Sequence, residues 1–96
     1  MAGKLSADAR AEALQPLIHW RFDATKEAIS RQYRFHDFSE AFAFMTRVAL
    51  LAEKANHHPD WSNSYAIVTI SLSTHDAGGL SQKDIDLARA IDKIIP

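Results

Sequence analysis

Three of the five histidines lie in one short part of the sequence, and each has a carboxylate, hydroxyl or proline nearby. His57 and His58 precede Pro59, and His75 precedes Asp76. Imidazole titrates near pH ~6.5, so such a cluster suits proton transfer at neutral pH. The same stretch contains no cysteine, no serine-nucleophile signature and no glycine-rich phosphate loop. We therefore expect histidine acid–base chemistry, supported by the rest of the chain.

The first histidine pair follows a helix that must position it. A helix beginning at Asp37 has to end by His58, because a proline disfavours helical geometry in the residue before it. Glu53 precedes His57 by one helical turn and lies on the same helix face, where it can orient the imidazole. Taken alone, a His-His-Pro corner is also typical of a simple helix-end turn, and Glu53 of a solvated helix charge.

A chain reversal is needed to bring His75 to this corner. A single strand over residues 61–73 would have its ends roughly 40 Å apart, at ~3.3 Å per residue, and the histidines could not share a site. Turn-favouring side chains at 62–64 offer the reversal. We therefore predict that Asp60–Trp61 pairs back against a strand over residues 67–74.

The other elements follow from caps and periodicity. We predict a first helix from Ser6 to about Gln15, strands over residues 19–22 and 29–35, and a last helix capped by Ser81. Asp84 completes a capping box there. The order α-β-β-α-β-β-α predicts an α+β fold, with a four-stranded antiparallel sheet and three helices on one face, forming a single domain over residues 1–96.

The main helix is apolar on more than one side. Its predicted core stripe consists of Phe38, Ala41, Phe42, Met45, Val48, Ala49 and Ala52. Phe44, Leu50 and Leu51 lie off this stripe. A helix with two apolar sides is usually buried on both, so we expect these three residues to face another subunit.

Composition limits the partners and the compartment. The 96 residues carry 11 basic and 12 acidic side chains without a basic run, which argues against direct nucleic-acid binding. No apolar segment has the length of a membrane span, and the N-terminus has no signal-peptide pattern. Together with the absence of cysteine, this predicts a cytoplasmic protein without disulfides.

The histidine motifs carry a family resemblance. Glu-x3-His-His-Pro-x-Trp at 53–61, Ser-Thr-His-acid at 73–76 and Gly-Leu-Ser-x-x-Asp-Ile at 79–85 resemble the pterin-4a-carbinolamine dehydratases, a family also called dimerisation cofactor of hepatocyte nuclear factor 1. The resemblance extends from Leu5 to Ile91. It departs from animal members at Asn56, where these often carry aspartate, and at Ala77, where a cysteine often follows the acid.

The resemblance implies a function and a set of residues. It implies dehydration of 4a-hydroxytetrahydrobiopterin to quinonoid dihydrobiopterin, without metal or organic cofactor, in tetrahydrobiopterin recycling for aromatic amino acid hydroxylases. The implied catalytic residues are His57, His58 and His75. The implied substrate-binding residues are Glu53, Trp20 and Asp84, and we add Ser73, Thr74 and Asp76 as groups near the third histidine.

Other interpretations stay open beside this one. Asp84 is explained by its capping role, and Trp20 alone would be a core residue. Three histidines with a glutamate can also bind zinc, although adjacent His57 and His58 are poorly placed to share one ion. A binding module is the alternative function, because animal members stabilise dimers of a homeodomain transcription factor and can act as coactivators in the nucleus. We also expect a homodimer or homotetramer.

Overall fold

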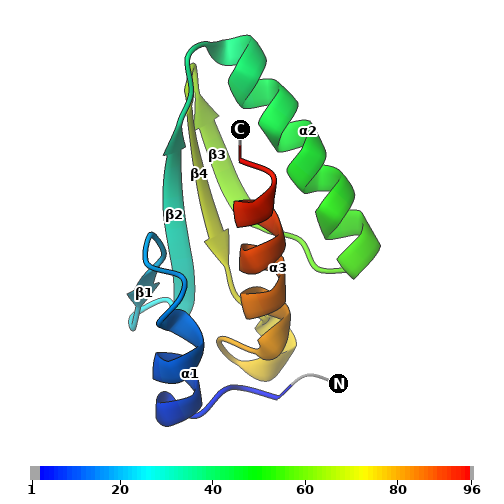
Figure 1. Cartoon of the computed structure of the whole chain (residues 1–96). Coiled ribbons are helices and arrows are strands. Elements are labelled where there is room, and N and C mark those ends of the chain that lie inside the picture. The colour runs from blue at the N-terminus through cyan, green and yellow to red at the C-terminus, as the bar shows by residue number, and fades with distance from the viewer. Residues whose placement is uncertain (1–2, 96) are drawn as a thin grey trace.

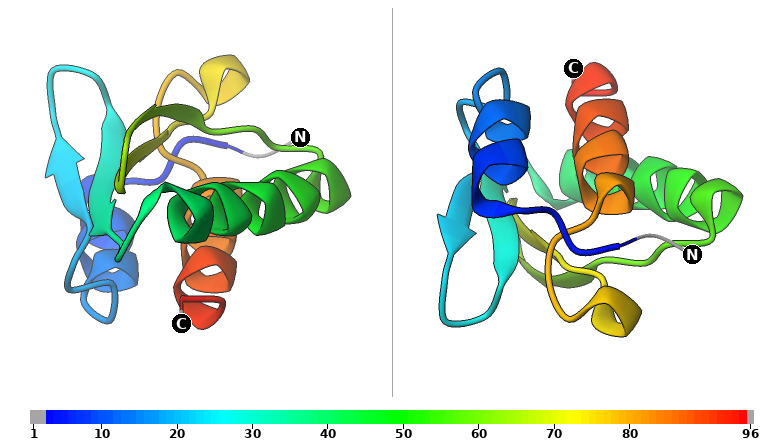
Figure 2. Two further views of the ribbon diagram at one scale, coloured as in Figure 1. Left: turned by 90° about the horizontal axis from the view of Figure 1, so that it is seen from above. Right: turned by 90° about the horizontal axis from the view of Figure 1, so that it is seen from below.

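The computed structural model describes residues 3–95. Along the chain it contains α1 (Ala7–Leu14), β1 (Arg21–Asp23), β2 (Ala28–Arg34), α2 (Phe38–Ala55), β3 (Asp60–Ser64), β4 (Ile67–Leu72), the 3-10 helix η1 (His75–Ala77) and α3 (Gln82–Lys93). The strands form one antiparallel sheet in the order β1-β2-β4-β3. The three α-helices lie on one face of this sheet (Figures 1 and 2), which confirms the predicted α+β fold.

The core lies between the sheet and the helices. Alternate residues of β4 are buried there, namely Val68, Ile70 and Leu72. The last helix contributes Ile85, Leu87, Ala88 and Ile91 to the same cluster. The alternation follows from the two-residue period of a strand, which sends every second side chain to the same face. The pattern therefore determines which face of β4 packs against α3.

The start of the chain follows the predicted caps but not the predicted strand. The Ser6 hydroxyl accepts a hydrogen bond from the Ala9 N–H, and α1 ends at Leu14, as expected. The first strand, predicted at residues 19–22, runs instead over Arg21–Asp23. Ile18, an apolar residue just after Pro16, is 78% exposed. Turns and irregular chain occupy residues 15–20, so the strand begins later.

The predicted hairpin over β3 and β4 is confirmed, with its turn two residues later than expected. Asp60 pairs with Ser71, and Ser64 pairs with Ile67. The reversal takes place at Tyr65, whose φ is +51°. The Asn63 side chain donates to the Tyr65 and Ile67 carbonyls from within β3, so it stabilises the turn without being in it.

The buried face of α2 differs from the prediction. The residues packed into the core are Ala41, Phe44, Val48 and Ala52. Phe44, expected at a subunit interface, is only 2% exposed, whereas Phe38 and Phe42 of the predicted stripe are 47% and 57% exposed. Leu50 is 67% exposed, and Leu51 is half-buried. With apolar residues on more than one side, periodicity does not determine which side meets the sheet.

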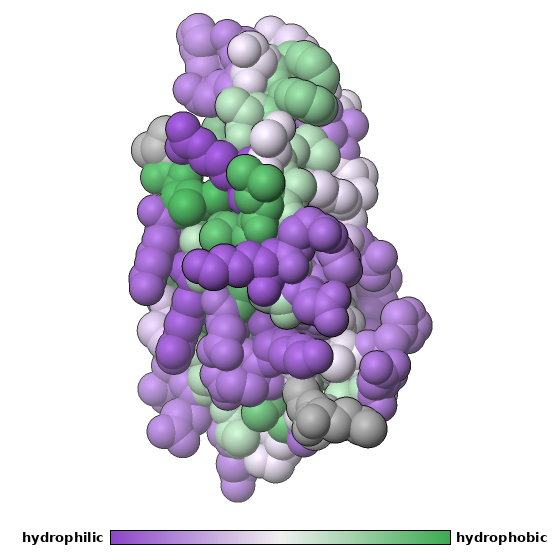
Figure 3. Space-filling view, turned by 90° about the vertical axis from the view of Figure 1, so that its right-hand side faces the viewer, coloured by the Kyte–Doolittle hydropathy of each residue, from purple (hydrophilic) through white to green (hydrophobic). Residues whose placement is uncertain are grey.

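Asp37 caps the start of α2, where the sequence predicted the helix to begin. Its carboxylate accepts from the Glu40 N–H, and the Glu40 side chain accepts from the His36 N–H, one residue before the cap. On the face that carries α2 and α3, hydrophobic residues gather in the upper half and hydrophilic residues cover the lower half (Figure 3). No helix within residues 3–95 is both long enough and apolar enough to cross a membrane.

Candidate active site

Three chain segments meet at one end of the molecule. In Figure 1, α2 descends to its C-terminal end at mid-height on the right, and η1 and the start of α3 lie below the middle of the view. The antiparallel hairpin returns the chain to this end, because Asp60 at the start of β3 is opposite Ser71 near the end of β4. This arrangement brings the His57–His58 corner to the segment that contains His75.

Asn56 lies directly before the two adjacent histidines. It ends α2 in the left-handed conformation, with φ of 50°, a geometry that asparagine adopts more readily than most residues. The His57 N–H then donates to the Ala52 carbonyl at 3.0 Å, closing the helix end. From this corner the two imidazoles reach different carboxylates.

His57 pairs with Asp84 at the start of α3. Its Nε2 lies 2.6 Å from Asp84 Oδ1, and the Asp84 side chain is fully buried. Asp84 Oδ2 accepts from the Ser81 N–H at 2.9 Å, which forms the predicted capping box, and from the Thr74 hydroxyl at 2.8 Å. Asp84 therefore has both a capping contact and a contact with a candidate catalytic histidine.

His58 pairs with Glu53 on the surface. Its Nε2 lies 2.6 Å from Glu53 Oε1, and the side chains are 58% and 76% exposed. Glu53 was expected to orient His57, one turn away, but the structure pairs it with His58. The left-handed Asn56 turns the chain after the helix, so helical spacing no longer sets the partner.

His75 begins η1 and is exposed, as is Asp76. The His75 side chain makes no hydrogen bond or ion pair with the described part of the chain. Ser73 donates its hydroxyl to the Glu27 carbonyl at 2.8 Å. Thr74 is buried, and its hydroxyl contacts Asp84 and Ser81. Within residues 3–95, His75 is thus the histidine of the cluster with both ring nitrogens free of hydrogen-bond partners.

These residues line a hollow of about 300 Å³. Its lining consists of Asn56, His57, His58, Ser73, Thr74, His75, Asp76 and Lys83. This volume is at the lower end of the range of small-molecule sites. Three imidazoles, hydroxyls and charges of both signs around one hollow can exchange protons with a polar, planar ligand.

Trp20 lies elsewhere. It is buried in the core, and its indole N–H donates to Asp92, eight positions after Asp84 on α3. At ~1.5 Å rise per residue, this places the two aspartates roughly 12 Å apart along the helix. Trp20 does not line the hollow around the three histidines.

Two lining residues were not expected from the sequence. Asn56 was noted only as a difference from animal relatives, although asparagine directly after a long apolar helix indicates a left-handed helix end. Lys83 follows the Ser81 cap and gave no signal of its own. It also lines, with His57, a second and more apolar hollow of about 420 Å³ between α2 and α3, where Leu51 and Leu87 lie.

The geometry of residues 3–95 does not match the zinc site considered from the sequence. Within this range, no group of three or more histidine, cysteine, aspartate or glutamate side chains is arranged to hold a metal ion. His57 and His58 each contact a different carboxylate. The arrangement places the imidazoles around a hollow instead of around a common point.

Comparison with known proteins gives consistent results over nearly the full chain. The family model described as "Pterin 4 alpha carbinolamine dehydratase" matches residues 3–94. A protein of Bradyrhizobium sp. (strain ORS 278), provisionally named a pterin-4-alpha-carbinolamine dehydratase, is 57% identical over 98% of this chain and 94% of its own. A Rhodopseudomonas palustris (strain HaA2) protein with the same provisional name is 52% identical over 98% of this chain and 93% of its own.

A solved structure agrees with these matches. The crystal structure of a transcriptional coactivator/pterin dehydratase from Brucella melitensis has a TM-score of 0.93 and 41% sequence identity, covering 98% of this chain and all of the other. The resemblance read from the histidine motifs is therefore confirmed. The chain belongs to the pterin 4 alpha carbinolamine dehydratase family.

Proposed function

We propose that the protein dehydrates a 4a-hydroxytetrahydropterin, such as 4a-hydroxytetrahydrobiopterin, to the quinonoid dihydropterin. The observation that supports this most directly is the convergence of three imidazoles on one hollow of about 300 Å³, within the part of the chain that the family model matches. Breaking the C4a–O bond requires a proton on the leaving hydroxyl. Forming the C=N bond requires removal of a proton from a ring nitrogen, so water is the only other product.

We assign the acid–base steps to His57 and His75. His57 is held by a buried carboxylate, and His75 has ring nitrogens free of protein partners within residues 3–95. Each positioned imidazole contributes roughly 10²–10⁴-fold in rate. This division gives one fixed and one exposed proton-transfer group. No metal or organic cofactor takes part in the proposed reaction.

We assign substrate binding to four other lining residues. His58, held by Glu53, contacts the pterin from the exposed rim, and Asp76 and Lys83 supply charges for its ring edge. Ser73 offers its hydroxyl oxygen as an acceptor, because its proton is given to Glu27. In the cell, the substrate would come from aromatic amino acid hydroxylases in the cytoplasm, so the protein would recycle tetrahydrobiopterin.

A coupled assay tests this function. The loss of 4a-hydroxypterin absorbance is followed during turnover of phenylalanine hydroxylase, with and without the protein and with a chelator. Acceleration that survives chelation is the expected result. Acceleration lost on chelation would revive a metal mechanism, and no acceleration would contradict the dehydratase proposal.

A second candidate function is binding to another protein through α2. Phe38, Phe42 and Leu50 expose large apolar side chains on this helix. The Brucella melitensis structure is described as a transcriptional coactivator as well as a pterin dehydratase. We propose that these side chains form the interface of a homodimer or homotetramer. In a host that has a homeodomain transcription factor, the same side chains would bind that factor instead. The mass of the assembly in solution, measured for the wild type and an α2 variant, tests the self-association.

A further inference from the structure

The Thr74 hydroxyl is part of a buried hydrogen-bond chain behind the histidines. Thr74 Oγ1 donates to Asp84 Oδ2 at 2.8 Å and lies 2.6 Å from Ser81 Oγ. A hydroxyl has one proton, so Ser81 must donate in its contact with Thr74. Thr74, Ser81 and Asp84 are 7%, 0% and 0% exposed, so water does not compete for these groups. The order of donation is therefore Ser81 to Thr74 to Asp84.

This hydrogen-bond chain determines which ring nitrogen of His57 carries the proton. Asp84 Oδ2 also accepts from the Ser81 N–H, and Oδ1 faces His57 Nε2 at 2.6 Å. The ionised carboxylate, which only accepts, satisfies all of these donors at once. His57 Nε2 must then bear a hydrogen, and in the neutral ring the lone pair is on Nδ1. Nδ1 makes no hydrogen bond with the described residues.

We propose that Thr74 is a positioning residue that acts through Asp84 on His57. By holding Oδ2, it turns Oδ1 toward the imidazole and keeps the neutral ring in its Nε2–H tautomer, with Nδ1 as the proton acceptor. The Thr74 side chain then makes no contact with the pterin. The catalytic consequence rests on the proposed dehydratase function, whereas the tautomer does not depend on it.

The Thr74 hydroxyl can be removed with less disturbance of the structure than the Ser81 hydroxyl. Its backbone N–H and carbonyl bond to Gly79 and Ala77, so the main chain is held without the hydroxyl. Ser81 also caps α3 through its hydroxyl, and its loss would disturb the helix start. A change at Thr74 therefore removes the contact with Asp84 at little cost to the local backbone.

Two variants and a control test the proposal. Thr74→Val keeps the shape and removes the hydroxyl, and Thr74→Ser keeps the hydroxyl. Thr69→Val makes the same change on β4, away from the histidine hollow. Side-chain ¹⁵N NMR above the titration range of histidine reports the tautomer of His57, and steady-state kinetics separates kcat from KM. Circular dichroism checks that each variant is folded.

The expected results differ between the variants. Thr74→Val should lower kcat about 10- to 100-fold, by analogy with the loss of groups that orient metal-binding histidines. It should also give a mixed His57 tautomer, with KM changed by less than about threefold. Thr74→Ser and Thr69→Val should retain the wild-type tautomer and kcat within about threefold.

Several outcomes would overturn the proposal. A neutral His57 in the Nδ1–H form in the wild-type protein would do so even if Thr74→Val failed to fold. A Thr74→Val protein with wild-type kcat and tautomer would do so as well. A wild-type protein with the Nε2–H tautomer but without dehydratase activity would contradict the proposed function and leave the hydrogen-bond chain intact.

Discussion

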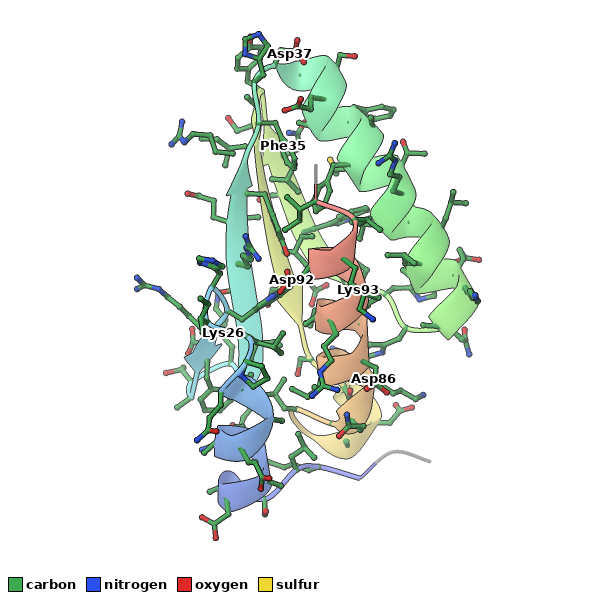
Figure 4. The ribbon with its side chains drawn as sticks, viewed as in Figure 1. Lys26, Phe35, Asp37, Asp86, Asp92 and Lys93 are labelled. Atoms are coloured by element: carbon green, nitrogen blue, oxygen red, sulfur yellow. The ribbon has the colours of Figure 1, made fainter. Side chains whose placement is uncertain are left out.

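The indole nitrogen of Trp20 lies 3.1 and 3.0 Å from the two carboxylate oxygens of Asp92, although the residues are 72 positions apart. Asp92 Oδ1 also accepts from Arg31 at 2.9 Å and from the Tyr33 hydroxyl at 3.1 Å. Figure 4 shows Asp92 extending from α3 toward the sheet. One carboxylate therefore joins α3 to β2 and to the segment before β1, away from the histidine hollow.

Trp20→Phe should destabilise the protein and leave its chemistry nearly unchanged. The variant loses a partly buried hydrogen bond and some packing, which together cost about 1–3 kcal/mol in unfolding free energy. Arg31 and Tyr33 still satisfy Asp92. Urea unfolding should show the loss, while kcat stays within about twofold. A large fall in kcat with unchanged stability would return Trp20 to the substrate site.

Tyr33 should make the protein sensitive to alkaline conditions. Burial, together with the neighbouring Asp92 carboxylate, raises the pKa of the Tyr33 hydroxyl well above its ordinary value, although Arg31 opposes this. Above pH ~10 the unfolded chain loses the proton and the folded protein keeps it, so the unfolding free energy falls with rising pH, by up to ~1.4 kcal/mol per pH unit. Below pH ~10 this contribution is constant.

Urea unfolding of wild type and Tyr33→Phe at pH 8, 10 and 11 measures this effect. The difference between the two proteins removes the contribution of lysines and other groups. We expect the wild type to lose more stability than the variant above pH 10. Parallel losses in both proteins would show that Tyr33 does not cause the alkaline sensitivity.

Local signals in the sequence predicted much of the fold. Ser6 and Ser81 act on their own helix ends, so their roles can be read within a few residues. The Asp92 cluster could not be predicted, because periodicity does not show which side chains meet across 72 positions. The prediction of the buried face of α2 was wrong for a related reason. Phe44 and Phe42 have similar hydrophobicity, and only the packed sheet determines which is buried.

The candidate site, like the fold, was predicted only in part from the sequence. The positions of His57, His58 and His75 around one hollow follow from the motifs and the predicted hairpin. The partner of each imidazole does not, since Glu53 contacts His58 and not His57. That choice depends on the left-handed conformation of Asn56, a single dihedral change that reverses the expectation from helical spacing.

His75→Ala should lower turnover by about 100-fold or more while the fold stays intact. The side chain is exposed and makes no hydrogen bond within residues 3–95, so its removal leaves no buried group unpaired. Loss of one acid–base group costs roughly 10²–10⁴-fold in rate. Steady-state kinetics and a thermal melt measure the two effects. Wild-type turnover would remove His75 from the mechanism.

Glu53→Gln should weaken substrate binding and leave the stability of the fold nearly unchanged. The pair with His58 is exposed, and such ion pairs contribute about 0–1 kcal/mol. We expect an unfolding free energy within about 0.5 kcal/mol of wild type and a several-fold higher KM, because His58 loses its anionic partner. Kinetics at constant ionic strength tests this. An unchanged KM would mean that the pair does not hold the substrate.

Phe42→Glu should reduce the mass of the assembly. Phe38 and Phe42 are exposed aromatic residues with ring centroids 5.8 Å apart, and a charge between two subunits would be costly to bury. Analytical ultracentrifugation measures the mass, and Ser39→Glu on the same exposed helix end is the control. Leu51, one of the three residues first expected at this interface, is a poorer choice because it packs against the core.

An unchanged mass for Phe42→Glu would show that this part of α2 does not join subunits. A mass reduced equally in both variants would indicate a general effect of charge at this end of the helix.

The left-handed Asn56 also gives a criterion for sorting related sequences. At a φ of 50°, asparagine, aspartate and glycine fit, whereas a β-branched residue would be strained and would favour another backbone path. His57 and His58 would then lose their contacts with Asp84 and Glu53. In relatives that keep His-His-Pro but carry valine, isoleucine or threonine before it, we expect the imidazoles to be displaced and the motif to be a poor guide to activity.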